Sequence, residues 1–142
     1  MKNLSKSTNP GLSNETISIA MLVLRLVAGA FMLTHGWGKM EALFSGEPIQ
    51  FGDPIGLGAE TSLVLAVFAE VICAILLIIG FATRLAVIPL VITMMVAALI
   101  VHADDPIGRQ ELPLLYAAMF VAVGFVGAGK YSVDYLLSKR SK

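Results

Sequence analysis

The sequence predicts an all-α protein, a four-helix transmembrane bundle with both termini in the cytoplasm. Hydrophobic residues make up 57% of the 142 residues and charged residues 14%, and the mean hydropathy is +0.84. A soluble domain carries about 25% charged residues, so this chain has too little charge to coat a surface that faces water. Four apolar runs each approach the roughly 20 residues that a helix needs to cross a bilayer.

The four apolar runs cover residues 17–37, 61–79, 83–101 and 112–128. Each is expected to be helical, because an isolated strand would leave its backbone N–H and C=O groups unpaired in lipid. Ser13 or Asn14 can cap the first helix. The short turn Gly80–Phe81–Ala82 makes the second and third helices antiparallel neighbours.

The segments outside the runs complete the predicted organisation. Residues 1–16 are polar and are expected to form a flexible cytoplasmic tail. The connection 40–60 mixes glycine, proline and acidic residues with apolar ones, so we expect it to fold over the mouth of the bundle. The membrane domain would then span 17–137, followed by a basic cytoplasmic tail at 138–142.

Lysine and arginine residues near helix ends predict the orientation, because they favour the cytoplasmic side. One end of the bundle collects Lys2, Lys6, Arg84, Lys130, Lys139, Arg140 and Lys142, and the other collects Lys39 and Arg109. This distribution predicts that both termini are cytoplasmic. The formal net charge is +0, which gives no electrostatic reason to expect a nucleic-acid partner. The expected surroundings are the lipid bilayer.

Two charged residues, Arg25 and Glu70, fall well inside the predicted helices. A charge at that depth is costly and usually faces a partner or a cavity. Counted from the predicted helix ends at about 1.5 Å per residue, the two residues lie at similar depths. We therefore predict a buried Arg25–Glu70 ion pair. It would either fix how the first two helices meet or belong to a proton or ligand site.

Residues 35–39 read HGWGK and end the first apolar run. His35 and Lys39 continue the helical face that begins at Arg25, and His102 ends the third run on the same side of the membrane. The two histidines can hydrogen-bond loop groups, form a ligand or proton site, or ligate a haem, although no other cofactor signature supports a haem. Trp37 fits either an interfacial belt residue or a stacking surface for a flat ligand.

The sequence contains no self-contained catalytic motif. Zinc-ligand spacing, a P-loop, a GxGxxG fingerprint and a nucleophile elbow are all missing, and no metal is expected. The single cysteine, Cys73, can form neither an internal disulfide nor a CxxC pair. Redox chemistry would therefore need a partner protein or a diffusible cofactor.

Six elements occur in order along the chain. They are an arginine in the first helix, an HG-x-x-K ending, a glutamate in the second helix, a Gly-x-x-x-Arg turn, a histidine that ends the third helix, and a G-x-G-K-x-S-x-D closing motif. Here they are Arg25; His35, Gly36 and Lys39; Glu70; Gly80 and Arg84; His102; and Gly127, Gly129, Lys130, Ser132 and Asp134. In these elements the chain resembles the DoxX family of bacterial membrane proteins.

This resemblance implies a multi-pass protein of the bacterial plasma (inner) membrane. Members are similar to the DoxD subunit linked to thiosulfate:quinone oxidoreduction, and some are associated with thiol-redox or quinone systems. We therefore expect an accessory subunit of a quinone- or thiol-linked redox system, with a redox partner protein or a second copy of the chain. Its ligand or proton site would use His35, Trp37, Lys39 and His102, with quinone as the ligand. The alternatives are a non-catalytic scaffold and a small proton-coupled transporter that uses Arg25 and Glu70.

Overall fold

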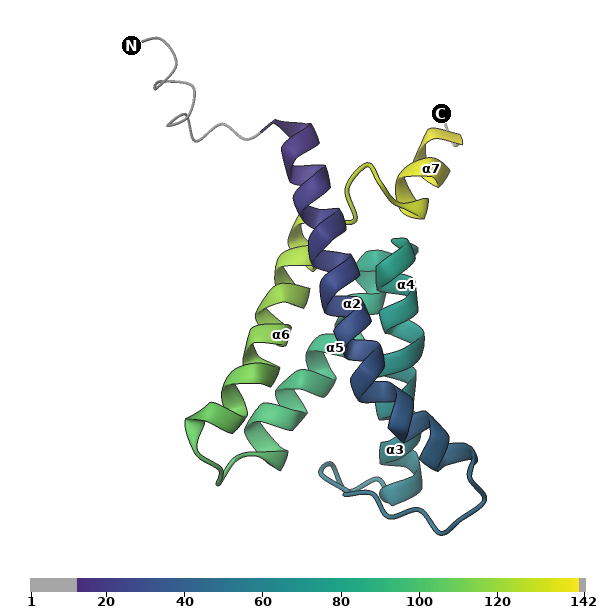
Figure 1. Cartoon of the computed structure of the whole chain (residues 1–142), viewed down its shortest axis with the longest axis vertical. Coiled ribbons are helices and arrows are strands. Elements are labelled where there is room, and N and C mark those ends of the chain that lie inside the picture. Colours follow the sequence, from purple (N-terminus) through teal and green to yellow (C-terminus); the bar gives the residue numbers. More distant parts are fainter. Residues whose placement is uncertain (1–12, 141–142) are drawn as a thin grey trace.

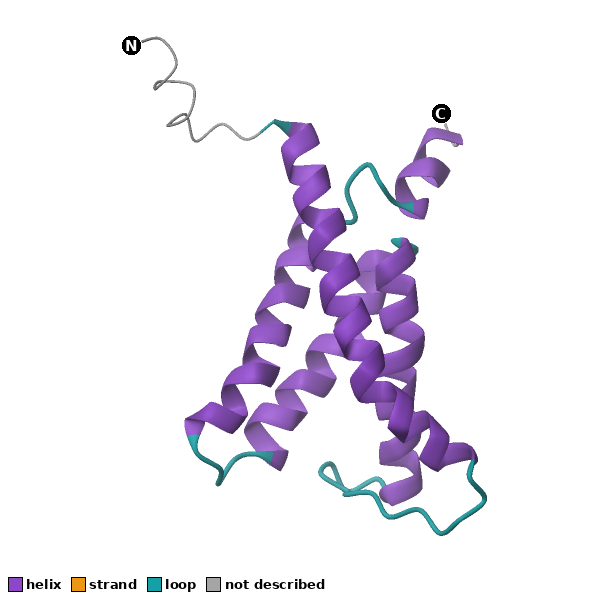
Figure 2. Cartoon of the chain, in the orientation of Figure 1, coloured by secondary structure: helices purple, strands orange, loops and turns teal. Residues whose placement is uncertain are grey.

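The computed structural model describes residues 13–140, and within them every regular element is a helix (Figure 2). Most of the predicted N-terminal tail lies outside the described residues. In chain order the elements are α2 (Asn14–Phe44), α3 (Ala59–Val67), the π-helical segment η1 (Phe68–Cys73), α4 (Ala74–Ile79), α5 (Thr83–Val96), the π-helical segment η2 (Ala97–Val101), α6 (Ile107–Val126) and α7 (Val133–Arg140). The start of α2 and the short helix α7 lie at the same end of the molecule (Figure 1).

Within residues 13–140, four helical spans are long and apolar enough to cross a membrane, namely Asn14–Phe44, Ala59–Ile79, Thr83–Val101 and Ile107–Val126. The predicted four-helix transmembrane bundle is thereby confirmed. Large apolar side chains point outward from several of these spans, among them Phe31, Leu85 and Phe125, which are 56%, 70% and 82% exposed. Such side chains are stable in contact with lipid, so the outer surface of the bundle suits a bilayer.

The first helix is longer than the sequence predicted. It ends at Phe44 rather than at Trp37, because Gly36 is accommodated inside the helix and the first strong stop signal is Ser45–Gly46, where Gly46 has a φ of +76°. Seven more residues add about 10 Å of helix. The start at Ser13 agrees with prediction, since its hydroxyl accepts a hydrogen bond of 3.1 Å from the Thr16 N–H.

The later boundaries differ as well. The fourth span begins at Ile107 rather than Leu112, because Pro106 precedes the helix and Pro113 is tolerated inside it. Residues 133–140, which the sequence did not identify as helical, form α7. Helix α7 therefore covers residues 133–137, the end of the predicted membrane domain, and residues 138–140 of the predicted basic tail.

Close packing of α2 against the second span is possible because two glycines face it. A Cβ atom at Gly29 would lie 2.5 Å from Cγ1 of Ile78, and one at Gly36 would lie 2.8 Å from Cγ2 of Val71. Helix α5 packs along α6. The resulting core contains buried residues from all four spans, including Ala28, Met32, Leu77, Leu90 and Phe120.

The connection between α2 and α3 packs onto the bundle, as we expected from its apolar residues. Ile49 and Phe51 lie against a small cluster around Leu63. The Asp53 carboxylate holds the end of the connection by accepting hydrogen bonds of 2.9 Å from the Leu57 N–H and the Gly58 N–H and one of 3.0 Å from the Ser62 hydroxyl. These hydrogen bonds lower the pKa of Asp53, and the bond from the Gly58 N–H is the largest cause.

The connection is expected to open at acid pH. Because the folded-state pKa of Asp53 is depressed, its stabilising contribution is complete above the ordinary aspartate value of about 4 and is lost as the pH falls through the lowered value. Digestion with pepsin between pH 5 and pH 2 should show cleavage in 45–58 only at the acid end of the range. Asp53→Asn should expose the connection to a neutral protease at pH 7, and equal resistance of that variant and the wild type would contradict this assignment.

Candidate functional site

A cavity of about 220 Å³ lies among α2, η1, η2 and α6, toward the end of the bundle opposite α7. Three of the four residues that the sequence proposed for the site, His35, Lys39 and His102, line it. The remaining lining residues are Glu70, Met94, Ala97, Arg109, Leu112, Pro113 and Tyr116. The structure thus brings together polar groups from the first, second and fourth spans and from His102, which directly follows the third.

The charged centre of this cavity is an ion pair between α2 and η1. Nζ of Lys39 lies 2.5 Å from both carboxylate oxygens of Glu70. The side chain of Glu70 is 3% exposed, whereas that of Lys39 is 30% exposed. A carboxylate at that burial is tolerated only with a compensating charge and hydrogen bonds, and Lys39 supplies both.

His102 is held by the turn that follows η2. Its Nδ1 donates to Oδ2 of Asp105 over 2.7 Å, and Nη1 of Arg109 lies 3.4 Å from the other carboxylate oxygen. The hydrogen bond from His102 is the main cause of a lowered pKa at Asp105, and the positive charge of Arg109 acts in the same direction. The expected hydrogen bond from His102 to a loop acid is therefore present. It leaves Nε2 of His102 available to a ligand.

Aromatic contacts complete the wall on the α6 side. The ring of His35 meets the ring of Tyr116 edge-on, with centroids 6.1 Å apart, and Tyr116 stacks on Phe120 at 6.0 Å. Tyr116 is 6% exposed, and the sequence analysis missed it. A phenol in an otherwise apolar span is a signal that could have identified it, because a buried tyrosine hydroxyl usually needs a partner.

Both π-helical segments of the described chain adjoin this cavity. Glu70 lies in η1, and η2 leads directly into His102, whose N–H bonds to the Ala97 carbonyl five residues earlier over 3.0 Å. Such segments are rare and occur frequently at functional sites, where they re-aim a side chain. Nothing in the sequence pattern predicted them.

A second, mostly apolar cavity of about 460 Å³ continues from the first. The two share Lys39, Glu70, Ala97 and His102. The second cavity runs between the α3–η1 side and α5, and the connection 45–58 contributes to it. Its other lining residues are Phe51, Pro54, Ile55, Ser62, Leu65, Ala66, Phe68, Pro89, Ile92, Thr93, Val96 and Val101. A polar recess and an apolar one therefore meet at the ion pair.

The predicted Arg25–Glu70 ion pair is wrong. Arg25 is fully buried, but its Nη2 donates to the Tyr131 carbonyl over 2.7 Å, and Nε and Nη1 find no hydrogen-bond partner among residues 13–140. The guanidinium lies against Gly80, where a Cβ would be 2.0 Å from Nη1. Arg25 therefore packs at the α7 end of the bundle, and Glu70 forms its ion pair with Lys39 instead.

The closing motif also belongs to that end, in a segment that we call the closing segment (residues 127–134). Asp134 accepts hydrogen bonds from the N–H groups of Ala82 and Thr83 over 2.7 and 3.0 Å, and so caps α5.

Ser132 donates to the Gly129 carbonyl over 2.6 Å and accepts from the Tyr135 N–H. Gly127 and Gly129 have φ values of +88° and +77°, and Nζ of Lys130 pairs with Glu15 at 2.9 Å. These contacts fasten the end of the chain to α2 and α5.

Trp37 does not line the cavity. It is 55% exposed, and its indole N–H donates to the Glu41 carboxylate over 2.9 Å. Because Trp37 is two residues from both His35 and Lys39, its side chain lies on the opposite side of the helix from theirs. Its position near the end of α2 matches the belt interpretation rather than the stacking one.

The two glycines of HGWGK are expected to respond differently to alanine. At Gly36 a Cβ would lie 2.9 Å from Cβ of Glu70 and 3.0 Å from its backbone carbonyl carbon, whereas at Gly38 no atom lies within 4 Å. Gly36→Ala should lower the free energy of unfolding by about 1–3 kcal/mol, and Gly38→Ala should raise it by about 0.5 kcal/mol through helix propensity. Thermal unfolding in detergent checks this, and equal effects at the two positions would contradict the packing of α2 on η1.

Comparison with known proteins identifies the family. A model of the DoxX family matches residues 20–103, more than half of the chain. The chain belongs to the DoxX family. It is 27% identical over 130 residues to a Bacillus subtilis protein named putative oxidoreductase CatD, and the matched region covers 91% of this chain and 95% of the relative.

Two further DoxX relatives are uncharacterized proteins. One, from Haemophilus influenzae, is 32% identical over 124 residues, covering 82% of this chain and 90% of the relative. The other, a membrane protein of Mycobacterium tuberculosis, is 29% identical over 139 residues, covering 86% of this chain and 83% of the relative. No solved structure matches the chain significantly.

Proposed function

We propose that this DoxX protein is a quinone-binding subunit of a redox system in the bacterial inner membrane, with its ligand site at the Lys39–Glu70 ion pair. The observation that carries the proposal is the junction of the polar cavity with the apolar one. A quinone has the matching chemistry, because it joins two carbonyl acceptors on a flat ring to an apolar tail. The name of the Bacillus subtilis relative, putative oxidoreductase, gives support.

The polar cavity offers donors for quinone carbonyl oxygens. The Lys39 ammonium, Nε2 of His102 and the Tyr116 hydroxyl belong to residues that line it, and Asp105 fixes the ring of His102 through Nδ1. The side chains of Lys39 and His102 are 30% and 34% exposed, so their N–H groups are accessible to the carbonyl oxygens of a bound ring. The apolar cavity beyond the ion pair would take the tail.

A bound quinone would accept two electrons and two protons. The chain carries no electron-carrier motif, so a partner protein would supply the electrons, and the residues of this chain would bind the ring and exchange protons at His102 and Glu70. A thiol-linked role has less support, since Cys73 is 2% exposed within the bundle.

We also propose that both termini face the cytoplasm. Among the described residues, Arg84, Lys130, Lys139 and Arg140 lie at the end that carries α7, whereas Lys39 and Arg109 lie toward the other end. This asymmetry favours an α7 end on the cytoplasmic side. The quinone site would then open toward the outer leaflet.

Binding of a short-chain ubiquinone tests the proposal. The purified protein, stripped of lipid in a mild detergent, should bind it saturably in calorimetric titration. His102→Ala should weaken binding about 10-fold through the loss of one hydrogen bond, whereas the matched control Trp37→Phe should bind like the wild type. Absence of saturable binding, or equal affinities in both variants, would exclude the site and favour a scaffold.

A further inference from the structure

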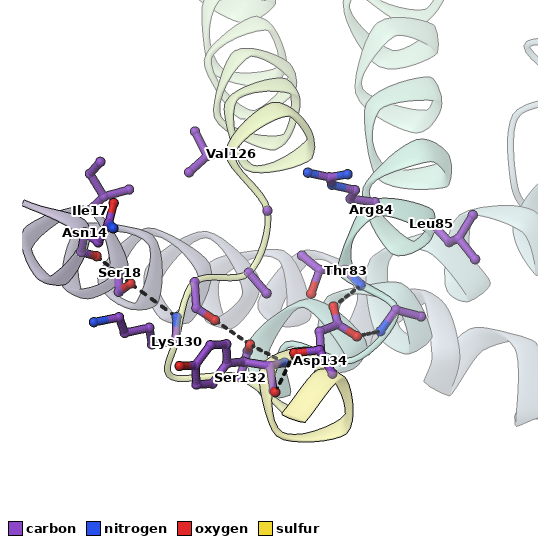
Figure 3. A pocket seen from close by; sticks show the side chains of 16 residues that line it. Asn14, Ile17, Ser18, Thr83, Arg84, Leu85, Val126, Lys130, Ser132 and Asp134 are labelled. Carbon is purple, nitrogen blue, oxygen red and sulfur yellow. Dashed lines mark hydrogen bonds between the residues drawn. The ribbon is translucent and has the colours of Figure 1, made fainter. Parts of the chain in front are cut away.

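A further cavity lies at the other end of the bundle, away from the proposed quinone site. It has a volume of about 610 Å³ and opens among the starts of α2 and α5, the end of α6 and the closing segment (Figure 3). Its polar lining includes Ser18, Thr83, Arg84, Lys130 and Ser132. None of these residues lines the quinone cavity.

The carboxylates near this cavity are already engaged. Both oxygens of Asp134 accept backbone N–H groups at the start of α5, and Glu15 is bound by Lys130 and by the Tyr131 hydroxyl. The exposed guanidinium of Arg84, by contrast, makes no hydrogen bond or ion pair among residues 13–140. It points across the cavity toward the chain that follows Val126 (Figure 3), where a Cβ at Gly127 would lie 3.7 Å from Nη2. A cation that has no partner within residues 13–140 therefore faces the cavity.

A buried hydroxyl in the same wall lacks a partner as well. Thr83 is 1% exposed, and its Oγ1 finds no hydrogen-bond partner in the described structure. A buried polar atom of this kind is rare in a native protein, since leaving it unpaired costs free energy. Arg25, which is bonded to the Tyr131 carbonyl of the closing segment, contributes a fully buried positive charge nearby, and two of its nitrogens find no partner within the described residues. The surroundings thus favour an anion that can accept hydrogen bonds.

The rim of the cavity is apolar. Leu85 and Val126 line it and are 70% and 49% exposed. Both lie at the ends of membrane spans, where we expect lipid phosphates to meet acyl chains. Basic pockets between membrane helices on the cytoplasmic side of the membrane typically bind the headgroups of anionic lipids. A free phosphate would use the cations but would gain nothing from the apolar rim.

We propose that this cavity binds the phosphate of an anionic phospholipid through Arg84 and the Thr83 hydroxyl, with the acyl chains lying along Leu85 and Val126. The lipid would brace the closing segment against the starts of α2 and α5. This site is independent of the quinone site, so loss of lipid binding leaves quinone affinity unchanged.

The test compares lipids with the same acyl chains and different headgroups. In the delipidated full-length protein, phosphatidylglycerol should raise the apparent melting temperature by about 5 °C more than phosphatidylcholine does. Arg84→Gln should remove at least half of that difference. Thr83→Val should melt at or slightly above the wild-type temperature without lipid, because it removes a buried hydroxyl that has no partner in the described structure, and it should still lose part of the lipid response.

Arg140→Gln is the matched control, since it removes an arginine at the same end that does not line the cavity. It should keep the full response to phosphatidylglycerol. An equal loss in the Arg84 and Arg140 variants would show general charge attraction and overturn the site, as would equal responses to the two lipids. A full response to millimolar inorganic phosphate would overturn the assignment to lipid.

Discussion

Replacing Lys39 by methionine is expected to lower the free energy of unfolding by about 3 kcal/mol, whereas Glu70→Gln should cost about 1 kcal/mol. The asymmetry follows from exposure. Removing Lys39 leaves unpaired a carboxylate that is 3% exposed, but removing the charge of Glu70 leaves an ammonium whose side chain is 30% exposed and can reach the open cavity. Thermal unfolding of the purified variants in detergent measures both.

The double variant Lys39→Met/Glu70→Gln provides the decisive comparison. It should be about 2 kcal/mol more stable than Lys39→Met alone, because it no longer carries an unpaired buried charge. Quinone binding should be lost in the double variant although stability is regained, which separates a ligand site from a purely structural pair. A double variant that binds quinone like the wild type would remove the ion pair from the site.

Gly80→Ala is expected to be the most disruptive small substitution in the chain. Gly80 has a φ of +71°, and an added Cβ would lie 2.0 Å from Nη1 of Arg25 and 2.6 Å from Cβ of Ser132. The left-handed conformation alone costs about 1 kcal/mol. Displacing a fully buried guanidinium adds more, and a total above about 3 kcal/mol is expected.

Gly56→Ala serves as the matched control for Gly80→Ala. Gly56 has a φ of +73°, almost the same as Gly80, but no atom lies within 4 Å of an added Cβ. It should therefore show only the backbone cost of about 1 kcal/mol. Trypsin should cleave at Lys130 in Gly80→Ala and not in the control, because the closing segment is released. Equal melting temperatures for the two variants would contradict the position of Arg25.

Helix content and the membrane-spanning character followed from the sequence because both depend on local composition. The 3.6-residue period predicted that His35 and Lys39 share one face of the first helix, and both residues line the cavity. The partner of Glu70 could not be derived in the same way. The prediction counted the depth of Arg25 from the cytoplasmic start of the first helix and took the first two helices to be level at that end. In the structure Arg25 lies against Gly80, which ends the second span, and Gly36 lies against Glu70, so α2 extends well beyond the second span at that end.

Other features depend on contacts between distant segments. Arg25 donates to Tyr131, which lies 106 residues away, and no periodicity within one helix indicates such a contact. No pattern in the sequence indicated the π-helical segments, one of which contains Glu70 while the other leads into His102. Tyr116 was missed because an isolated aromatic residue in an apolar span usually contributes only to packing.

Photoaffinity labelling with an azido-quinone tests the proposed site most directly. After illumination of the purified protein and digestion, mass spectrometry should locate adducts in residues 35–39, 94–102 and 112–116, the segments that line the polar cavity together with Glu70. An excess of unlabelled quinone should suppress these adducts. Adducts spread over the lipid-facing surface and insensitive to competitor, or confined to the closing segment, would contradict a quinone site at the Lys39–Glu70 pair.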